Sequence, residues 1–275
     1  MTLLENKRII KKNSKTFYFA SSFLSRDIKE KVLAVYAFCR LYDDSADIKL
    51  AEIPKKLEKQ INHLNLNTDV LDQIKLGIDS DRNFSRYNNI HDLIKYSYRV
   101  AGCVGLIMCE LMKVDNPKDR YHAIDLGIAM QITNICRDVI EDSKNGRIYI
   151  PNDMLPSDDI QANKAQVIKS VEKLIALSEK YYDSALYAIK YIPIKSRFSI
   201  LLALRLYQSI GKKIKRNKKI FFSNKINTNK FEKFIILNTC IIEFIFKHVF
   251  SFNSRKHNAQ LHDALKGLPF INEKI

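Results

Sequence analysis

The chain has 275 residues, of which 46% are hydrophobic and 28% charged, and this balance excludes an intrinsically disordered protein. Only 7 glycines and 6 prolines occur, too few for the many turns of a β-sandwich or a doubly wound α/β fold. We therefore predict an all-α protein. No linker or break in composition divides the chain, so we expect a single domain over residues 1–275, with peripheral tails at residues 1–12 and about 252–275.

The formal net charge of +16 indicates either lysine-rich, solvated helix faces or an anionic partner, such as nucleic acid, anionic lipid or a phosphorylated small molecule. The five cysteines show no C-x-x-C spacing and predict reduced thiols in the core. The first residues are polar and basic, unlike the apolar segment of a secretory signal. These features favour a cytoplasmic protein.

Apolar residues at helical spacing between the prolines predict a series of helices. Their expected ranges are 29–48, about 54–61, 91–112, 117 to about 142, 162–191, 196–215 and 231–250. Asn116 and Pro117 are a typical helix start, and Asn145-Gly146 is a turn that ends the same helix. Residues 62–89 show only weak helical periodicity.

Two late stretches bear on contact with a membrane. Residues 212–219 hold six cations in eight positions, as expected for a solvated helix end and equally for attraction to an anionic, peripheral membrane surface. Residues 234–246 are apolar, but about 13 residues fall short of the roughly 20 that span a bilayer. We expect this stretch to lie mainly in the core.

A first group of polar residues lies within the apolar helix expected over 29–48. Tyr36, Arg40, Asp43 and Asp47 are spaced by 4, 3 and 4 residues, so they share one helix face. That face carries a tyrosine, an arginine and two carboxylates.

A second group lies within the helix expected from residue 117. Gln131, Asn134, Asp138 and Asp142 are spaced by 3, 4 and 4 residues and again share one face. A third aspartate pair, at positions 115 and 119, flanks the proline of the helix start and indicates capping chemistry instead.

Carboxylates on the inner faces of apolar helices are costly unless a cation compensates them. The two faces become favourable if they lie opposite each other across a cavity. Hard divalent cations such as Mg²⁺ take oxygen ligands and bridge one or two carboxylates to substrate phosphates. The sequence therefore predicts a metal-assisted diphosphate site between these helices.

Several segments together resemble one known family. They are N-S-K-T-F (13–17), Y-A-F-C-R-L-Y-D-D-S-A-D (36–47), Y-S-Y-R-V-A-G-C-V-G-L-I-M (96–108), D-L-G-I-A-M-Q-I-T-N-I-C-R-D-V-I-E-D (125–142), R-I-Y-I-P (147–151) and, more weakly, L-R-L-Y-Q-S-I (204–210). In this order they resemble the squalene/phytoene synthases, and among these the bacterial phytoene synthases in particular. The resemblance covers residues 13 to about 230.

The resemblance implies the all-α isoprenoid synthase fold, with helices around a central active-site cavity. It implies that the four aspartates and Asn134 bind Mg²⁺, or Mn²⁺, and through the metal two prenyl diphosphates. Arg40 and Arg137 would contact diphosphate oxygens, which suit a planar charged fork. Tyr96 matches a tyrosine that helps in proton transfer. The substrate-binding positions it implies are Ser14, Lys15, Phe17, Tyr36, Gln131, Asn134, Arg147, Tyr149 and Tyr207.

The implied reaction condenses two geranylgeranyl diphosphates head to head (1-1′), through a cyclopropyl diphosphate, to phytoene, the first committed step of carotenoid biosynthesis. No NADPH is expected in that case. The alternative is a C30 enzyme that uses farnesyl diphosphate to make dehydrosqualene, squalene or hydroxysqualene. Lys225 stands where the family has an arginine, so it keeps the charge but loses the fork.

Two other classes of function fit the sequence less well than an enzyme does. A non-catalytic relative that acts as an assembly factor would lose the aspartates, and this chain keeps all four. A nucleic-acid-binding protein is suggested by charge alone, without a helix-turn-helix, zinc or arginine-rich signature, so no nucleic-acid partner is expected.

Overall fold

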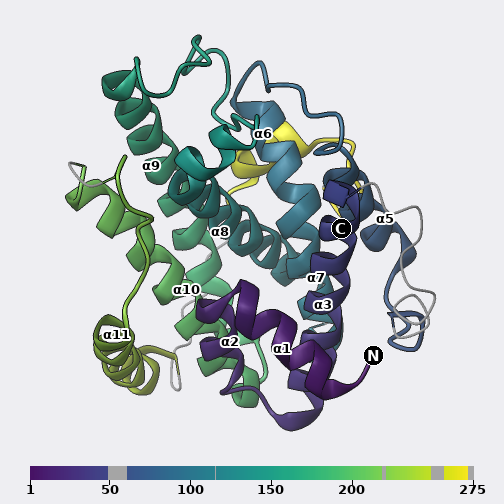
Figure 1. Cartoon of the computed structure of the whole chain (residues 1–275). Helices are drawn as coiled ribbons and strands as arrows, with labels where there is room; N and C mark the ends of the chain where they lie inside the picture. Colours follow the sequence, from purple (N-terminus) through teal and green to yellow (C-terminus); the bar gives the residue numbers. More distant parts are fainter. Residues whose placement is uncertain (49–60, 115, 219–220, 249–256, 272–275) are drawn as a thin grey trace.

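The computed structural model describes residues 1–48, 61–114, 116–218, 221–248 and 257–271, and every regular element in these ranges is a helix (Figure 1). This confirms the all-α prediction. The α-helices are α1 (Leu3–Asn13), α2 (Lys15–Ser21), α3 (Arg26–Ile48), α5 (Thr68–Asp79), α6 (Ile90–Ser97), α7 (Cys103–Met112), α8 (Pro117–Lys144), α9 (Lys164–Ala188), α10 (Ile194–Arg216) and α11 (Lys230–Glu243). Short π-helices η1 (Tyr98–Gly102) and η3 (Phe244–His248) and 3₁₀ turns η2 (Ile189–Tyr191) and η4 (Ala259–Leu265) complete them.

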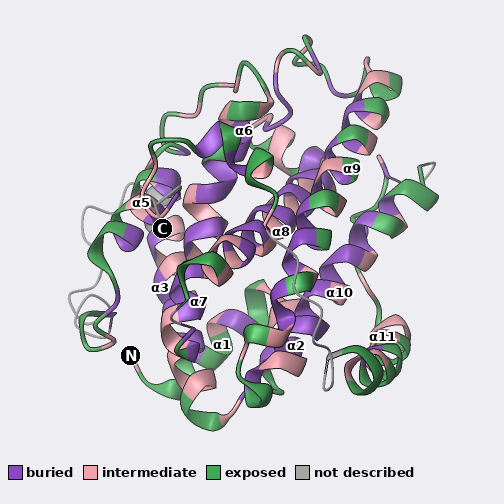
Figure 2. Cartoon of the chain, turned by 180° about the vertical axis from the view of Figure 1, so that it is seen from behind, coloured by how far each residue is buried: buried purple, intermediate pink, exposed green. Residues whose placement is uncertain are grey.

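Helix α8 is the centre of the bundle and packs against α7, α9 and α10 (Figures 1 and 2). Ile124, Ile128 and Ile132, each four residues apart, are fully buried along one of its faces. The helix begins where expected, since the side chain of Asn116 accepts a hydrogen bond from the amide of Lys118.

Two glycines allow α8 to approach its neighbours closely. A Cβ at Gly105 of α7 would lie 2.1 Å from the carbonyl oxygen of Ala123, and one at Gly127 of α8 would lie 2.1 Å from that of Ala101. Any larger residue would force the backbones apart, so these glycines set the helix spacing beside the cavity described below.

Most of the predicted helices are confirmed, with several differences. The range 91–112 is α6, η1 and α7 in succession, and α5 occupies part of the segment with weak signals. The helix expected near 54–61 lies outside the described residues, apart from its last residue. Residues 1–12, expected to be a tail, form most of α1, which packs on α3 through the fully buried Ile10.

Residues 257–271 also differ from the expected tail. Leu265 of η4 is fully buried, and the hydroxyl of Tyr98 donates to the carbonyl of Pro269 at 2.5 Å. A buried side chain and a backbone carbonyl of this segment therefore help to complete the bundle beside α6.

The prediction that residues 234–246 lie mainly in the core is wrong. Helix α11 packs on α10 with Cys240 buried, whereas Phe234 is 61%, Ile242 58% and Phe246 78% exposed. Among the described residues α11 packs mainly on α10, and the exposed side chains lie on its other face. Within the described residues, no helix is both long and apolar enough to cross a membrane.

Candidate active site

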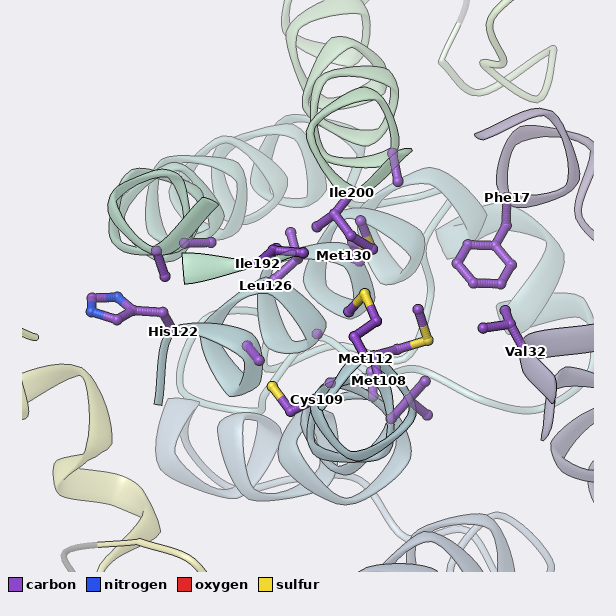
Figure 3. A pocket seen from close by; sticks show the side chains of 18 of the residues that line it. Phe17, Val32, Met108, Cys109, Met112, His122, Leu126, Met130, Ile192 and Ile200 are labelled. Atoms are coloured by element: carbon purple, nitrogen blue, oxygen red, sulfur yellow. The ribbon is translucent and has the colours of Figure 1, made fainter. Parts of the chain in front are cut away.

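A cavity of about 280 Å³ lies between α3, α7, α8 and α10. Its middle is apolar and is lined by residues such as Met108, Leu126 and Met130 (Figure 3). Phe17 and His122 lie at opposite sides of it in Figure 3. The polar groups Tyr36, Gln131, Asn134 and Tyr207 also line the wall. The cavity thus combines a long apolar surface with a few polar side chains from three helices.

Helix α3 carries the first aspartate group just beyond this wall. Tyr36 and Cys39 line the cavity, and Asp43 follows Cys39 by about one helical turn. The guanidinium of Arg40 lies 3.0 Å from Asp43 and 2.5 Å from Asp44. Asp47 lies one turn further along α3, and its side chain is outside the described residues.

Helix α8 carries the second group in the same relation to the cavity. Asn134 lines the wall, and Asp138 and Asp142 follow at one-turn intervals. Asp138 accepts hydrogen bonds from two nitrogens of Arg137, at 2.9 and 2.5 Å. Lys225 lies 3.0 Å from Asp138 and also pairs with Glu141, so the lysine in the family's arginine position does reach this group.

Tyr207 of α10 connects the two aspartate helices. Burial raises the pKa of Tyr36 well above its usual range, and the neighbouring Tyr207 adds to the rise. Tyr207 also helps to hold the pKa of Arg137 above its ordinary value, after the larger contribution of Asp138 and against the effect of burial. Tyr36 of α3, Asn134 of α8 and Tyr207 of α10 line the same cavity, so the polar residues that precede both aspartate groups border one space.

The α8 carboxylates concentrate negative charge at this end. Burial raises the pKa of Asp142 to about 7, and repulsion from Asp138 and Glu141 contributes. The side-chain oxygen of Asn134 is buried without a hydrogen-bond partner. An unsatisfied carbonyl oxygen on the same helix face as two carboxylates is a donor set that fits a hard divalent cation.

Ser14 and Phe17 are placed by the start of α2. The hydroxyl of Ser14 caps this helix by accepting from the amide of Phe17, at 3.4 Å. The Phe17 ring then stacks on Tyr36, with centroids 5.9 Å apart. The adjacent Lys15 is exposed. The structure thus brings Phe17 to the polar residues of the cavity, whereas Lys15 faces solvent.

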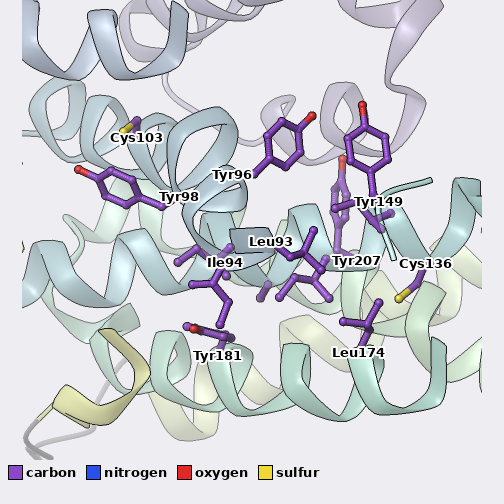
Figure 4. Packing of buried hydrophobic residues seen from close by; sticks show 14 of the residues in the cluster. Leu93, Ile94, Tyr96, Tyr98, Cys103, Cys136, Tyr149, Leu174, Tyr181 and Tyr207 are labelled. Carbon is purple, nitrogen blue, oxygen red and sulfur yellow. The ribbon is translucent and has the colours of Figure 1, made fainter. Parts of the chain in front are cut away.

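Tyr96 and Tyr149 form a separate cluster around a residue that the sequence did not reveal. Their hydroxyls donate to the two carboxylate oxygens of Asp81, at 2.8 and 2.9 Å, and their rings stack at 5.2 Å. Figure 4 shows Tyr96, Tyr149 and Tyr207 pointing the same way. Neither Tyr96 nor Tyr149 is among the cavity-lining residues. Asp81 follows a segment with weak periodicity, so no pattern could have singled it out.

Arg147 follows the turn at the end of α8, close to Asp142. Its amide donates to the carbonyl of Asp142 at 2.9 Å, and its charge lowers the pKa of that carboxyl slightly. Gly146, with φ of 76°, makes the turn that brings Arg147 back towards the helix. Arg147, an expected substrate-binding position, therefore borders the second aspartate group.

The chain matches the family model for squalene/phytoene synthase over residues 10–75 and 55–232. These ranges cover well over half of the sequence, so the chain belongs to the squalene/phytoene synthase family. Members of this family are prenyltransferases, and the fold and the paired aspartate helices agree with that class.

Named relatives make the comparison more specific. A phytoene synthase of Rhodobacter capsulatus is 30% identical over 266 residues, covering 82% of this chain and 77% of that protein. A 4,4′-diapophytoene synthase of Staphylococcus haemolyticus is 28% identical, covering 78% and 89%. A dehydrosqualene synthase crystal structure with ligand matches with a TM-score of 0.79 at 26% identity, over 89% of this chain and 97% of that one.

Proposed function

We propose that the chain is a phytoene synthase, which condenses two geranylgeranyl diphosphates head to head through a cyclopropyl diphosphate. One observation carries the proposal. The apolar cavity that extends between Phe17 and His122 has the aspartate groups of α3 and α8 one turn beyond its polar wall. A substrate with an anionic head and a long hydrocarbon tail is complementary to such a site.

The metal ligands of the proposed site are Asp43, Asp47, Asn134, Asp138 and Asp142. Mg²⁺, or Mn²⁺ in its place, would neutralise the diphosphate and stabilise it as a leaving group. The unpartnered oxygen of Asn134 and the raised pKa of Asp142 both support a cation here, since each is relieved by positive charge.

Two arginines lie beside the proposed metal ligands. Arg40 and Arg137 are held by neighbouring carboxylates. With these carboxylates holding a metal, the guanidinium groups would be available to bind phosphate oxygens through two parallel hydrogen bonds. Lys225 would add a charge without the fork. Ser14, Lys15, Gln131 and Arg147 are the remaining groups proposed to contact the substrate heads.

The cavity wall would govern what happens after diphosphate leaves. The stacked rings of Phe17 and Tyr36 lie at the polar groups, where they can stabilise a carbocation at the reacting carbon. Apolar side chains along the rest of the wall exclude water, so the cation reacts with the second prenyl chain instead of being hydrolysed.

The length of the substrate's hydrocarbon tail distinguishes the two candidate activities within the family. Phytoene synthases of several organisms are among the similar proteins, which favours the C40 substrate. The diapophytoene and dehydrosqualene synthases favour the alternative, a C30 enzyme that uses farnesyl diphosphate.

Product analysis tests the proposal. The purified chain is incubated with Mg²⁺ and either geranylgeranyl or farnesyl diphosphate, without NADPH, and the extracted hydrocarbon is identified by chromatography and mass spectrometry. We expect phytoene from the first substrate. A C30 hydrocarbon from farnesyl diphosphate alone would move the enzyme to the alternative, and the absence of diphosphate release from both would refute the catalytic assignment.

We also propose that α11 is the contact with an anionic membrane. Its exposed apolar side chains recur at helical spacing on one face and are Phe231, Phe234, Ile235, Ile241 and Ile242, and Ile245 of η3 continues the pattern. Of the basic segment, Lys213 and Lys218 are paired with Glu232 and Glu172, whereas Lys212, Lys215 and Arg216 are exposed. An apolar face next to free cations is complementary to anionic lipid.

A further inference from the structure

A buried cluster of titratable side chains lies on another part of α8 from the aspartate group. Asp125 is fully buried, and its two carboxylate oxygens contact the Nε2 atoms of His262 and His257, each at 2.8 Å. Ser184 of α9 donates to the same carboxylate at 2.5 Å. None of these residues belongs to the proposed reaction.

The cluster joins parts of the chain that are far apart in sequence. Asp125 lies on α8, whereas His257 and His262 flank the start of η4, more than 130 positions later. The two histidines are separated by four residues, within the spacing that histidine pairs use to bind zinc. A ligand bound by all three would fasten the C-terminal segment onto α8.

The donor set is that of a transition-metal site. One carboxylate and two imidazoles offer ligand atoms that all lie within 4.8 Å of one another. Among the described residues, the side chains that contact Asp125 are those of His257, His262 and Ser184. No lysine or arginine is among them. A fully buried carboxylate without a permanent cation is costly, and a divalent ion would remove this cost.

We propose that Asp125, His257 and His262 bind one Zn²⁺ ion that fastens the C-terminal segment to α8, with a water molecule as the fourth ligand. Each histidine then presents a lone pair at Nε2, and its ring proton resides on Nδ1. Tetrahedral Zn²⁺ with bonds of about 2.0–2.1 Å places neighbouring ligand atoms about 3.3 Å apart. The observed separations of 2.8 Å must widen by about half an ångström, and rotation of the two imidazoles provides this.

The site would also support the cavity wall. Ser184 contacts Nδ1 of His122 at 2.9 Å, and His122 lines the cavity across from Phe17. A hydrogen-bonded chain therefore extends from the cluster to the cavity. The zinc site itself does not depend on the proposed reaction, because its ligands contact neither aspartate helix face.

Metal analysis of the full chain tests the proposal. The protein is purified without a histidine tag or chelators, and its zinc content is measured by mass spectrometry before and after incubation with Zn²⁺ and desalting. We expect about one zinc per chain in the wild type and in a control with the exposed His91→Ala, and a loss of about tenfold or more in His262→Ala. The double variant Asp43→Asn and Asp138→Asn should keep the zinc, which separates this site from the proposed catalytic metal.

A second measurement uses only the wild type and so does not depend on the folding of a variant. Replacement of the zinc by Co²⁺ should give the intense visible bands of a four-coordinate ion, and X-ray absorption of the zinc form should show imidazole ligands. If the wild type retains no metal, or only a six-coordinate ion with oxygen ligands, the proposal is overturned, and the cluster is a hydrogen-bonded clasp between Asp125 and the two histidines.

Discussion

The guanidinium of Arg137 holds both carboxylate oxygens of its sequence neighbour Asp138, at 2.9 and 2.5 Å. Asp138, a proposed metal ligand, is therefore paired with Arg137, a proposed diphosphate-binding residue, when neither metal nor diphosphate is bound. In the proposed site Asp138 would hold the metal and Arg137 would contact diphosphate oxygens, so binding of both would separate this pair. The pair keeps the buried aspartate satisfied in the free enzyme.

Replacement of Arg137 by lysine tests the importance of the planar fork. Lysine keeps the charge but makes single hydrogen bonds, so we expect kcat/KM to fall by about 10–100-fold with little change in folding. Steady-state kinetics with geranylgeranyl diphosphate measures the effect. Lys75→Arg, at an exposed surface pair, is the matched control. Unchanged kinetics in Arg137→Lys would contradict a direct role in diphosphate binding.

Loss of one aspartate from each group should abolish turnover. Asp43→Asn and Asp138→Asn are each expected to lower kcat by at least about 1,000-fold, because each removes charge that holds the metal and the leaving group. Asp72→Asn, which removes an exposed carboxylate of α5, should leave activity unchanged. Diphosphate release is the readout. Activity that survives in both variants would contradict the metal assignment, and circular dichroism verifies that the variants fold.

The raised pKa of Asp142 makes the stability of the metal-free protein depend on pH. The carboxyl ionises near 3.8 when unfolded and near 7 when folded. As the pH rises from about 4 to 7, ionisation therefore favours the unfolded chain, and the full penalty is present above pH 7. Asp142→Asn removes this penalty.

Urea unfolding without metal measures the difference. We expect Asp142→Asn to be more stable than the wild type by on the order of 2 kcal/mol at pH 8, with the gain vanishing towards pH 4. Saturating Mg²⁺ should reverse the order at pH 8, since the ionised carboxylate is then a ligand. A gain that grows towards low pH would contradict the assignment of the raised pKa to Asp142.

Tyr96→Phe separates a positioning role from proton transfer. The variant removes one of the two hydroxyls that satisfy the buried Asp81, so we expect a loss of about 1–2 kcal/mol in the free energy of unfolding. Turnover should change by less than about threefold, since Tyr96 lies outside the cavity wall. Tyr149→Phe removes the other hydroxyl and should behave alike. A fall in kcat of about 100-fold at unchanged stability would instead support direct proton transfer by Tyr96.

The exposed face of α11 should bind lipid. Sedimentation with vesicles of phosphatidylglycerol and phosphatidylcholine is expected to capture the wild type, and the double variant Phe234→Ser and Ile242→Ser should lose at least about tenfold in binding. Leu4→Ser with Leu76→Ser removes exposed apolar side chains elsewhere and serves as the control. Equal binding of both double variants would show that α11 is not the contact. Pure phosphatidylcholine should bind weakly, because the cations then have no partner.

Helical periodicity predicted the architecture well where long apolar patterns exist. The polar start of α8 at Asn116 and its end near Asn145 were both predicted, because capping and turn chemistry is local. The solvent face of α11 was not predicted. Its composition is that of a core helix, and its exposure depends on how few elements lie against it, which no local pattern encodes.

Residue spacing also predicted which side chains share a face, and the structure adds which faces meet. Tyr207 was implied by resemblance alone, and the packing of α10 places it on the wall of the cavity that Tyr36 and Asn134 also line. Asp81, His257 and His262 were missed. The role of each residue depends on a hydrogen-bond partner more than ten residues away in sequence. Helical periodicity does not predict such distant pairs.

The central claim is that the aspartate groups of α3 and α8 hold the diphosphate at the polar residues of one apolar cavity. A crystal structure with Mn²⁺ and the unreactive thio-analogue of geranylgeranyl diphosphate tests it most directly. We predict anomalous peaks between Asp43 and Asp138, with the hydrocarbon tail extending past Met130 towards His122. Manganese bound elsewhere, or a tail outside this cavity, would contradict the account.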